Sequence, residues 1–207
     1  MTVYKDYIFN HSMPTYVHSY IAEPIIKLLD HTKNKNILDL GCGNGALVKR
    51  LVNLDFNAFG TDASTTGIEK ASEFSNERFA LQDLSADELP EKFKNLKFDT
   101  IISTEVIEHL YDPKSFIKFC KKHLKDNGGG ELIISTPYHG YLKNLVIGIL
   151  GKWDTHANPL WDGGHIKFWS KRSIYKLLES EGFEVINFVG CGRLPFFWKS
   201  MIIKAKI

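Results

Sequence analysis

The stretch Ile37-Leu38-Asp39-Leu40-Gly41-Cys42-Gly43-Asn44-Gly45 decides the fold, because an apolar run passes directly into a turn with glycine at every second position. The run predicts a buried strand, and residues 46–54 have the apolar spacing of a helix. Glycine is needed where φ is positive or where a ligand lies against the backbone, and a helix N-terminus presents unpaired N–H groups. The stretch therefore predicts a ligand-binding loop, although ordinary turns also use glycine.

An acidic residue, Asp62, lies 21 positions beyond Gly41 of this loop. Asp62 ends the apolar segment 57–61. In nucleoside-binding βαβ units, an acid about 20 residues after the glycine loop accepts hydrogen bonds from ribose hydroxyls. The alternative is that Asp62 only caps the helix predicted over 64–74. The combination of loop and acid favours a nucleoside site.

The rest of the chain alternates strands with helices. Further strands are predicted over 79–81, 98–103, 131–135, 183–189 and 198–206, and further helices over 19–30, 113–124 and 170–181. The pattern indicates one α/β domain over 1–207, whose ligands lie at the carboxyl ends of parallel strands. Residues 1–30 are expected to form an aromatic N-terminal arm and a helix, which either closes over the loop or pads the core. Residues 136–169 are expected to form an inserted substrate cap.

Composition sets few limits on partners. The formal net charge of +2 gives no strong attraction to nucleic acid or to an anionic membrane. Three scattered cysteines without metal-ligand spacing predict a reducing compartment, and residues 1–20 lack the apolar core of a signal peptide. The apolar run 145–150 is too short to span a bilayer. A cytoplasmic location is expected.

With these residues the chain resembles the class I S-adenosylmethionine-dependent methyltransferases. Residues 37–45 are similar to their first motif, Asp62 to their second-strand acid, 82–84 to their adenine-side motif, and 98–109 to their fourth strand and the segment after it. The resemblance implies a Rossmann-like, seven-stranded, mostly parallel sheet with helices on both faces and with the third and sixth strands at its edges. It also implies S-adenosyl-L-methionine as the methyl donor.

The resemblance assigns donor-binding roles to individual residues. It implies that Gly41, Cys42 and Gly43 hold the methionine moiety and ribose, Asp62 the ribose hydroxyls, Ala63 and Leu84 the adenine ring, Asp83 the adenine amino group, and Thr104 the amino-acid end of the donor. Tyr16 or His18 is expected to reach the donor carboxylate.

A second set of polar residues follows the fourth strand. Glu105, Glu108 and His109 would share one face if this segment were helical, and two carboxylates with an imidazole could ligate Mg²⁺ or Mn²⁺. The run resembles that of ubiquinone-biosynthesis O-methyltransferases and of small-RNA 2′-O-methyltransferases, and the latter implies a fourth ligand, His165. A cation would lower the pKa of an acceptor hydroxyl, and His109 or His165 would take its proton. The alternative is a structural role, with Glu105 capping the turn and His109 packed under the donor.

The acceptor is predicted from the cap. Its aromatic residues, among them Trp153, Phe168 and Trp169, favour a hydroxyl on a small aromatic or apolar molecule, and the amphipathic segment 141–150 could contact a membrane surface. RNA is the alternative, but the lysines of the helix 113–124 fit an ordinary solvated face. A non-catalytic module that binds S-adenosylmethionine is a further alternative. His123 on the same helix is expected at the surface.

Overall fold

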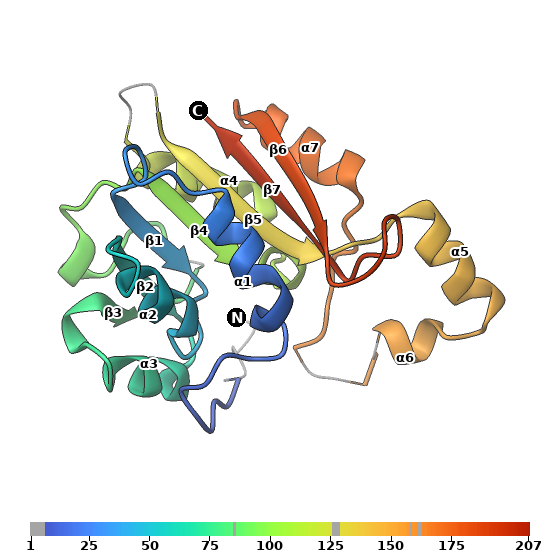
Figure 1. Ribbon diagram of the computed structural model, residues 1–207, viewed down its shortest axis with the longest axis horizontal. Helices are drawn as coiled ribbons and strands as arrows, with labels where there is room; N and C mark the ends of the chain where they lie inside the picture. The colour runs from blue at the N-terminus through green and yellow to red at the C-terminus, as the bar shows by residue number, and fades with distance from the viewer. Residues whose placement is uncertain (1–6, 85, 126–128, 158, 161–162) are drawn as a thin grey trace.

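The computed structural model describes residues 7–84, 86–125, 129–157, 159–160 and 163–207. A seven-stranded sheet with the order β3-β2-β1-β4-β5-β7-β6 forms its centre (Figure 1). The strands are β1 (Asn36–Leu40), β2 (Asn57–Asp62), β3 (Phe79–Leu81), β4 (Thr100–Thr104), β5 (Glu131–Pro137), β6 (Glu184–Cys191) and β7 (Ser200–Lys206). β1 to β5 pair in parallel, whereas β7 is antiparallel to both β5 and β6. The predicted Rossmann-like sheet, with its third and sixth strands at the edges, is confirmed.

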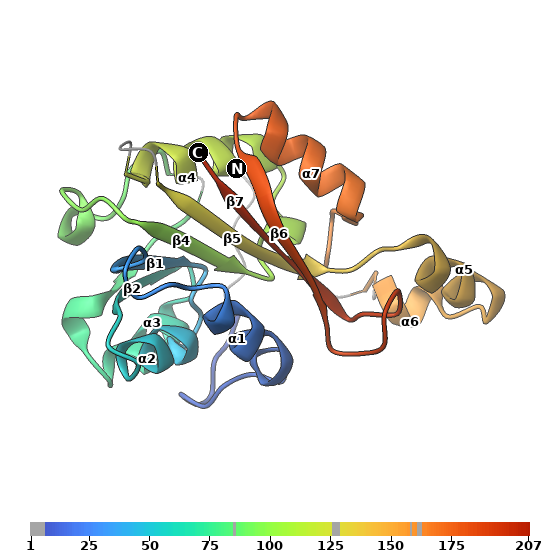
Figure 2. The same ribbon diagram turned by 45° about the horizontal axis from the view of Figure 1, so that its top comes forward.

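Helices cover both faces of the sheet (Figure 2). One face carries α1 (His18–Lys27), α2 (Ala46–Val52) and α3 (Thr65–Ser72), and the other carries α4 (Pro113–His123) and α7 (Lys171–Ser180). In α4, Phe116, Ile117 and Cys120 recur at helical spacing and are buried against the sheet. Each face therefore has its own apolar core.

The histidine near the end of α4 departs from its prediction. His123 is 5% exposed, and its ring centroid lies 4.5 Å from that of Phe119. It follows Cys120 by three positions and Phe116 by seven, which places it on the apolar face of the helix. The prediction of a surface position was wrong, because the lysines beside His123 occupy the solvated face.

The chain between β5 and α7 leaves the sheet. It forms α5 (Tyr141–Ile149) and α6 (Trp153–Ala157), which project beyond the end of the sheet in both views, and returns through residues 163–170 (Figures 1 and 2). The predicted cap, residues 136–169, covers this segment and the last two residues of β5, and its role toward a substrate stays a prediction. None of the described helices is long and apolar enough to cross a membrane.

Candidate functional site

The glycine loop between β1 and α2 has a conformation that requires glycine. Gly41, Gly43 and Gly45 all have positive φ, of 82°, 53° and 74°. A Cβ atom at Gly45 would lie 2.8 Å from Ala71 and from the ring of Phe79, both of which are buried. The loop is thus held closely against α3 and β3, with its backbone amides at the carboxyl edge of the sheet.

Asp62, at the end of β2, is tied to this loop. Its Oδ2 accepts a hydrogen bond from the Gly43 amide at 2.7 Å, and its Oδ1 accepts one from the Ser64 amide at 2.7 Å. The residue that caps α3 is Ser64, whose Oγ accepts from the Gly67 amide at 3.0 Å. Asp62 is therefore not the helix cap, and its half-buried carboxylate is oriented beside the glycine loop, where it can also accept from hydroxyls of a ligand.

The other predicted donor-binding residues lie along the same edge. The Gln82 amide donates to the Asp62 carbonyl at 2.8 Å, which places the residues after β3 next to those after β2. Ala63 and Leu84 are half-buried, Asp83 is exposed, and Thr104 is buried at the end of β4. Cys42, within the loop, is also buried, and burial raises the pKa of its thiol.

The side chains predicted to reach the donor carboxylate have other partners in this structure. The Tyr16 hydroxyl is hydrogen-bonded to Nζ of Lys199, and Nδ1 of His18 is 2.8 Å from Oγ1 of Thr15. Tyr16 is also largely exposed. Neither contact involves the glycine loop.

Asp39 is a polar residue of this site that was not predicted. It is 1% exposed, and neither carboxyl oxygen has a hydrogen-bond partner among the described residues. Burial, and then the charge of Asp62, raise the pKa of Asp39 to about 8. A cationic group of a ligand would stabilise its charged form. The sequence feature that could have identified Asp39 is an acidic residue inside an otherwise apolar strand.

The N-terminal arm lies across the loops that follow β1 and β2. Nδ2 of Asn44 donates to the carbonyls of His11 and Met13, each at 2.8 Å. Oγ of Ser64 donates to the carbonyl of Tyr7 at 2.7 Å, and a Cβ atom at Gly43 would lie 2.7 Å from the ring of Phe9. Of the two roles expected for the arm, these contacts favour closure over the loop; residues 1–6 lie outside the described part.

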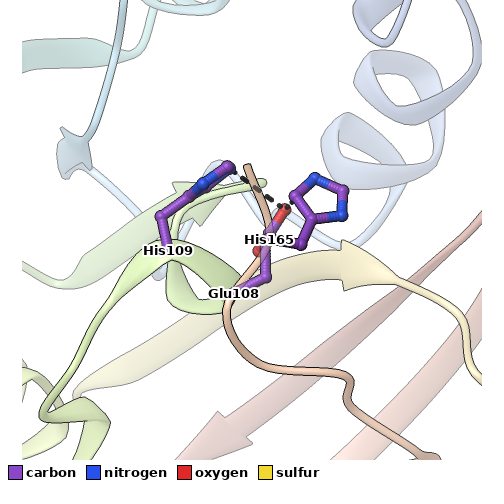
Figure 3. A group of neighbouring side chains, drawn as sticks. All are labelled: Glu108, His109 and His165. Carbon is purple, nitrogen blue, oxygen red and sulfur yellow. Dashed lines mark ion pairs between the residues drawn. The ribbon is translucent and has the colours of Figure 1, made fainter. Parts of the chain in front are cut away.

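The second polar group comes together from two distant segments. One ligand atom from each of Glu108, His109 and His165 lies within 4.8 Å of the other two, and the Nε2 of each histidine is 4.0 Å from Oε1 of Glu108 (Figure 3). Glu108 and His109 belong to the 3-10 turn η3 (Ile107–His109), which follows β4, whereas His165 comes from the returning end of the cap. Three of the four predicted ligands therefore meet.

Backbone contacts explain why these segments meet. The amides of Ile166 and Lys167 both donate to the Glu108 carbonyl, at 3.0 and 2.9 Å. Nδ1 of His109 is 3.2 Å from the Gly164 carbonyl, which can only accept, so Nδ1 carries the proton in this contact. Nε2 of His109 then keeps its lone pair and faces Glu108.

Glu105 does not join this group. Residues 104–110 do not form the helix that would align the three side chains, because Glu105 has a left-handed φ of 54° and only one 3-10 turn follows it. Its carboxylate instead accepts from Oγ of Ser135 at 2.8 Å and from Oγ of Ser200 at 3.2 Å. Burial raises the pKa of Glu105 to about 7.

The electrostatics of the group suit a cation. Glu108 is fully buried, its Oε2 accepts from Oγ1 of Thr136 at 3.0 Å, and its Oε1 has no hydrogen-bond partner among the described residues. Burial and then the charge of Glu105 raise the pKa of Glu108. Burial and then the charge of His109 lower the pKa of His165 to about 4. One carboxylate and two neutral imidazoles fit Mn²⁺, Fe²⁺ or Zn²⁺ better than Mg²⁺.

Comparisons with known proteins agree with this architecture. A family model described as a methyltransferase domain matches residues 11–187. A ubiquinone biosynthesis O-methyltransferase of Rickettsia felis is 30% identical over 172 residues, which cover 83% of this chain and 69% of that protein.

Two solved structures show the same fold. The magnesium protoporphyrin IX methyltransferase of Synechocystis PCC 6803, with bound S-adenosylhomocysteine, has a TM-score of 0.66 and 21% identity over 90% of this chain and 81% of that one. The methyltransferase domain of bacterial CtHen1-CN has a TM-score of 0.65 and 22% identity over 90% of this chain and 97% of that one.

Proposed function

The chain belongs to the S-adenosylmethionine-dependent methyltransferases, and we propose that it transfers a methyl group to a hydroxyl oxygen of a small aromatic or apolar molecule. The observation that carries this proposal is the group formed by Glu108, His109 and His165 beside the glycine loop. Val106 connects the two sites, because a Cβ atom at Gly41 would clash with its side chain and because its carbonyl accepts from the His109 amide at 2.9 Å.

The donor would lie along the carboxyl edge of the sheet. There Gly41 to Gly43 would contact its methionine and ribose portions, Asp62 its ribose hydroxyls, and Ala63 and Leu84 its adenine ring. Asp83 would bind the adenine amino group and Thr104 the amino-acid end. Asp39, whose buried carboxyl lacks a partner among the described residues, would accept from a cationic part of the donor.

The residues of η3 and of the cap would prepare the acceptor. A hydroxyl is a weak nucleophile until its proton leaves, and His165, neutral at pH 7 because its pKa is lowered to about 4, can accept that proton. If a divalent cation were held by Glu108, His109 and His165 instead, the cation would lower the pKa of the hydroxyl, and the imidazole of His165 would serve as a ligand and not as the base. His109, held by the Gly164 carbonyl, keeps its Nε2 directed at the same place.

The surface favours a small molecule over RNA. RNA binding would be expected to use a basic stripe on α4, yet two lysines of that helix, Lys121 and Lys122, have partners within the chain. Nζ of Lys121 donates to the Glu181 carbonyl at 2.9 Å, and Nζ of Lys122 is 2.6 Å from the Glu88 carboxylate. The cap, by contrast, offers aromatic and aliphatic side chains next to the polar group.

The outer side of the cap supports a contact with apolar material. Tyr141, Ile149 and Leu150 of the α5 region are exposed, as are Leu194 and Phe196 in the loop between β6 and β7, which lies beside the cap in both views (Figures 1 and 2). A membrane surface that delivers the acceptor, or an apolar tail of the acceptor itself, would cover these side chains.

The three cysteines are free and buried, in keeping with action in the reducing cytoplasm.

The test is methyl transfer from donor with an isotopically labelled methyl group to a panel of phenols and catechols that carry apolar substituents. We expect a labelled O-methyl product, identified by NMR, and no transfer to short RNA with a free terminal ribose. Transfer to RNA alone, or a label attached only to nitrogen or carbon, would overturn the proposal. Binding of donor with no transfer to any acceptor would favour the non-catalytic alternative.

A further inference from the structure

Phe9 of the N-terminal arm fills a corner between two glycines. A Cβ atom at Gly43 would lie 2.7 Å from the Phe9 ring, and one at Gly67 would lie 3.1 Å from it. Gly43 belongs to the loop after β1, whereas Gly67 lies in the first turn of α3. A Cβ atom at Gly67 would also lie 2.9 Å from the Gly43 carbonyl oxygen, so the two segments are themselves in close contact. Because neither glycine has a side chain, the ring reaches the backbone of both segments.

The backbone of the arm holds this ring in place. The Phe9 amide donates to Oγ1 of Thr66 at 3.0 Å, and the Tyr7 carbonyl accepts from Oγ of Ser64 at 2.7 Å. Both hydroxyls belong to the start of α3, where Ser64 is the N-cap. The rings of Tyr7 and Phe9 are also in contact, with centroids 4.8 Å apart. The start of α3 therefore sets the position of the Phe9 ring.

Gly43 is the residue through which the ring acts on the donor site. Its amide donates to Oδ2 of Asp62 at 2.7 Å, and its φ of 53° lies in the left-handed region. Glycine has the widest choice of backbone conformations, so one hydrogen bond to its amide restrains such a residue weakly. The direction in which a Cβ atom of Gly43 would point is occupied by the Phe9 ring. The ring and the carboxylate together restrict Gly43 to the observed conformation.

Phe9 lies away from the residues that follow β4. In the sheet order, β2 and β4 lie on opposite sides of β1. Phe9 contacts the segments after β1 and β2, whereas Glu108 and His109 follow β4. A change at Phe9 is therefore expected to act on the donor side of the site.

We propose that Phe9 is a positioning residue of the donor site. Its ring holds Gly43 in the conformation that directs the amide to Asp62, and the carboxylate fixed in this way accepts from the ribose hydroxyls of the donor. Binding is tighter because less order has to be created when the donor arrives. Phe9 acts on the ligand-free loop, so its role differs from retention of a bound donor by the arm. This inference rests on the proposed function, because it takes Gly43 and Asp62 as donor-binding residues.

The first measurement is hydrogen exchange of the Gly43 amide, followed by NMR in the ligand-free full chain. We expect Phe9→Ala to accelerate this exchange at least about tenfold, because the hydrogen bond from Gly43 to Asp62 opens more often. Amides of β4 should keep their wild-type rates, which separates a local effect on the loop from a general loss of stability. Phe9→Leu, which keeps an apolar side chain in the corner, should restore most of the protection.

The second measurement is the affinity for S-adenosylhomocysteine, determined by calorimetry. Phe9→Ala should bind at least about tenfold more weakly than the wild type, and Phe9→Leu should recover most of the affinity. The matched control is Phe74→Ala, which removes a partly exposed ring that follows the other end of α3. It should bind as the wild type does and leave the exchange of the Gly43 amide unchanged.

Equal affinity of Phe9→Ala and the wild type would overturn the proposal, and so would weaker binding with unchanged exchange of the Gly43 amide. If Phe9→Ala fails to fold, Thr66→Val decides by the same two measurements, because it removes the acceptor of the Phe9 amide. A smaller loss of both protection and affinity is then expected, and no loss of either counts against the proposal. Absence of binding in the wild type would contradict the proposed function. The exchange measurement needs no ligand and would still decide whether Phe9 positions Gly43.

Discussion

Nε2 of His165 lies 4.0 Å from Oε1 of Glu108, although Glu108 precedes the cap and His165 lies near its end. The contact exists because the amides of Ile166 and Lys167, next to His165, both donate to the Glu108 carbonyl. The meeting of Glu108, His109 and His165 therefore depends on the cap, which supplies His165.

The group formed by Glu108, His109 and His165 is expected to bind Mn²⁺. We expect Glu108→Gln to weaken Mn²⁺ binding at least about tenfold, because it removes the anionic ligand while keeping the shape of the side chain. The measurement is the free Mn²⁺ signal in electron paramagnetic resonance titrations. Glu88→Gln, on an exposed acid, is the control and should bind as the wild type does. Equal affinity in Glu108→Gln would argue for the structural alternative.

The glycine loop leads to a prediction about stability. Gly45→Ala should lower the free energy of unfolding by at least about 1–2 kcal/mol, because alanine is strained at a φ of 74° and its Cβ would press on Ala71 and Phe79. Urea denaturation measures the change. Gly148→Ala is the control within α5, since a Cβ there meets nothing within 4 Å. A Gly45→Ala variant as stable as the wild type would contradict the described loop geometry.

The N-terminal arm is expected to retain the donor. Asn44→Ala removes both hydrogen bonds to the carbonyls of His11 and Met13. We expect faster proteolytic cleavage within residues 7–13 and faster release of S-adenosylhomocysteine, measured by stopped-flow displacement. Asn53→Ala, on the exposed end of α2, serves as the control. Unchanged cleavage and release in Asn44→Ala would show that the arm merely pads the core.

Asp39 should make the stability of the ligand-free protein depend on pH. Its pKa is about 8 in the folded chain and about 3.9 when unfolded. Between these values the folded state binds more protons than the unfolded state, so the free energy of unfolding falls as pH rises toward 8. Asp39→Asn removes this contribution to the pH dependence of stability.

The melting temperature of Asp39→Asn should therefore rise relative to that of the wild type by at least about 2–4 °C between pH 5 and pH 8, which corresponds to about 1 kcal/mol. Any constant cost of the buried amide cancels in this comparison. Asp154→Asn, at an exposed position of α6, should show no such trend. A wild type and an Asp39→Asn variant with parallel profiles would contradict the buried, unpaired carboxyl.

Much of the fold was predictable because its signals are local. The apolar run and glycines of residues 37–45 specify β1 and its loop, and the distance to Asp62 identifies the end of β2, whose carboxylate accepts from the Gly43 amide. His165 was predicted only through a family resemblance, since no local pattern connects it with Glu108.

Other features depend on tertiary structure. The spacing of Glu105, Glu108 and His109 suggests a shared helical face, but the left-handed backbone at Glu105 turns its carboxylate toward Ser135 and Ser200. Asp39 was not singled out, because its importance lies in burial without a hydrogen-bond partner among the described residues, and burial is not visible in a short window of sequence.

In the proposed function, the acceptor hydroxyl is activated at the group formed by Glu108, His109 and His165, while the donor is held separately at the glycine loop. The most direct measurement is the rate of O-methyl transfer by Glu108→Gln at saturating S-adenosylmethionine, compared with that of the wild type. We expect the rate to fall at least about a hundredfold, with the affinity for S-adenosylhomocysteine within about threefold of the wild-type value. A transfer rate equal to that of the wild type would contradict the account.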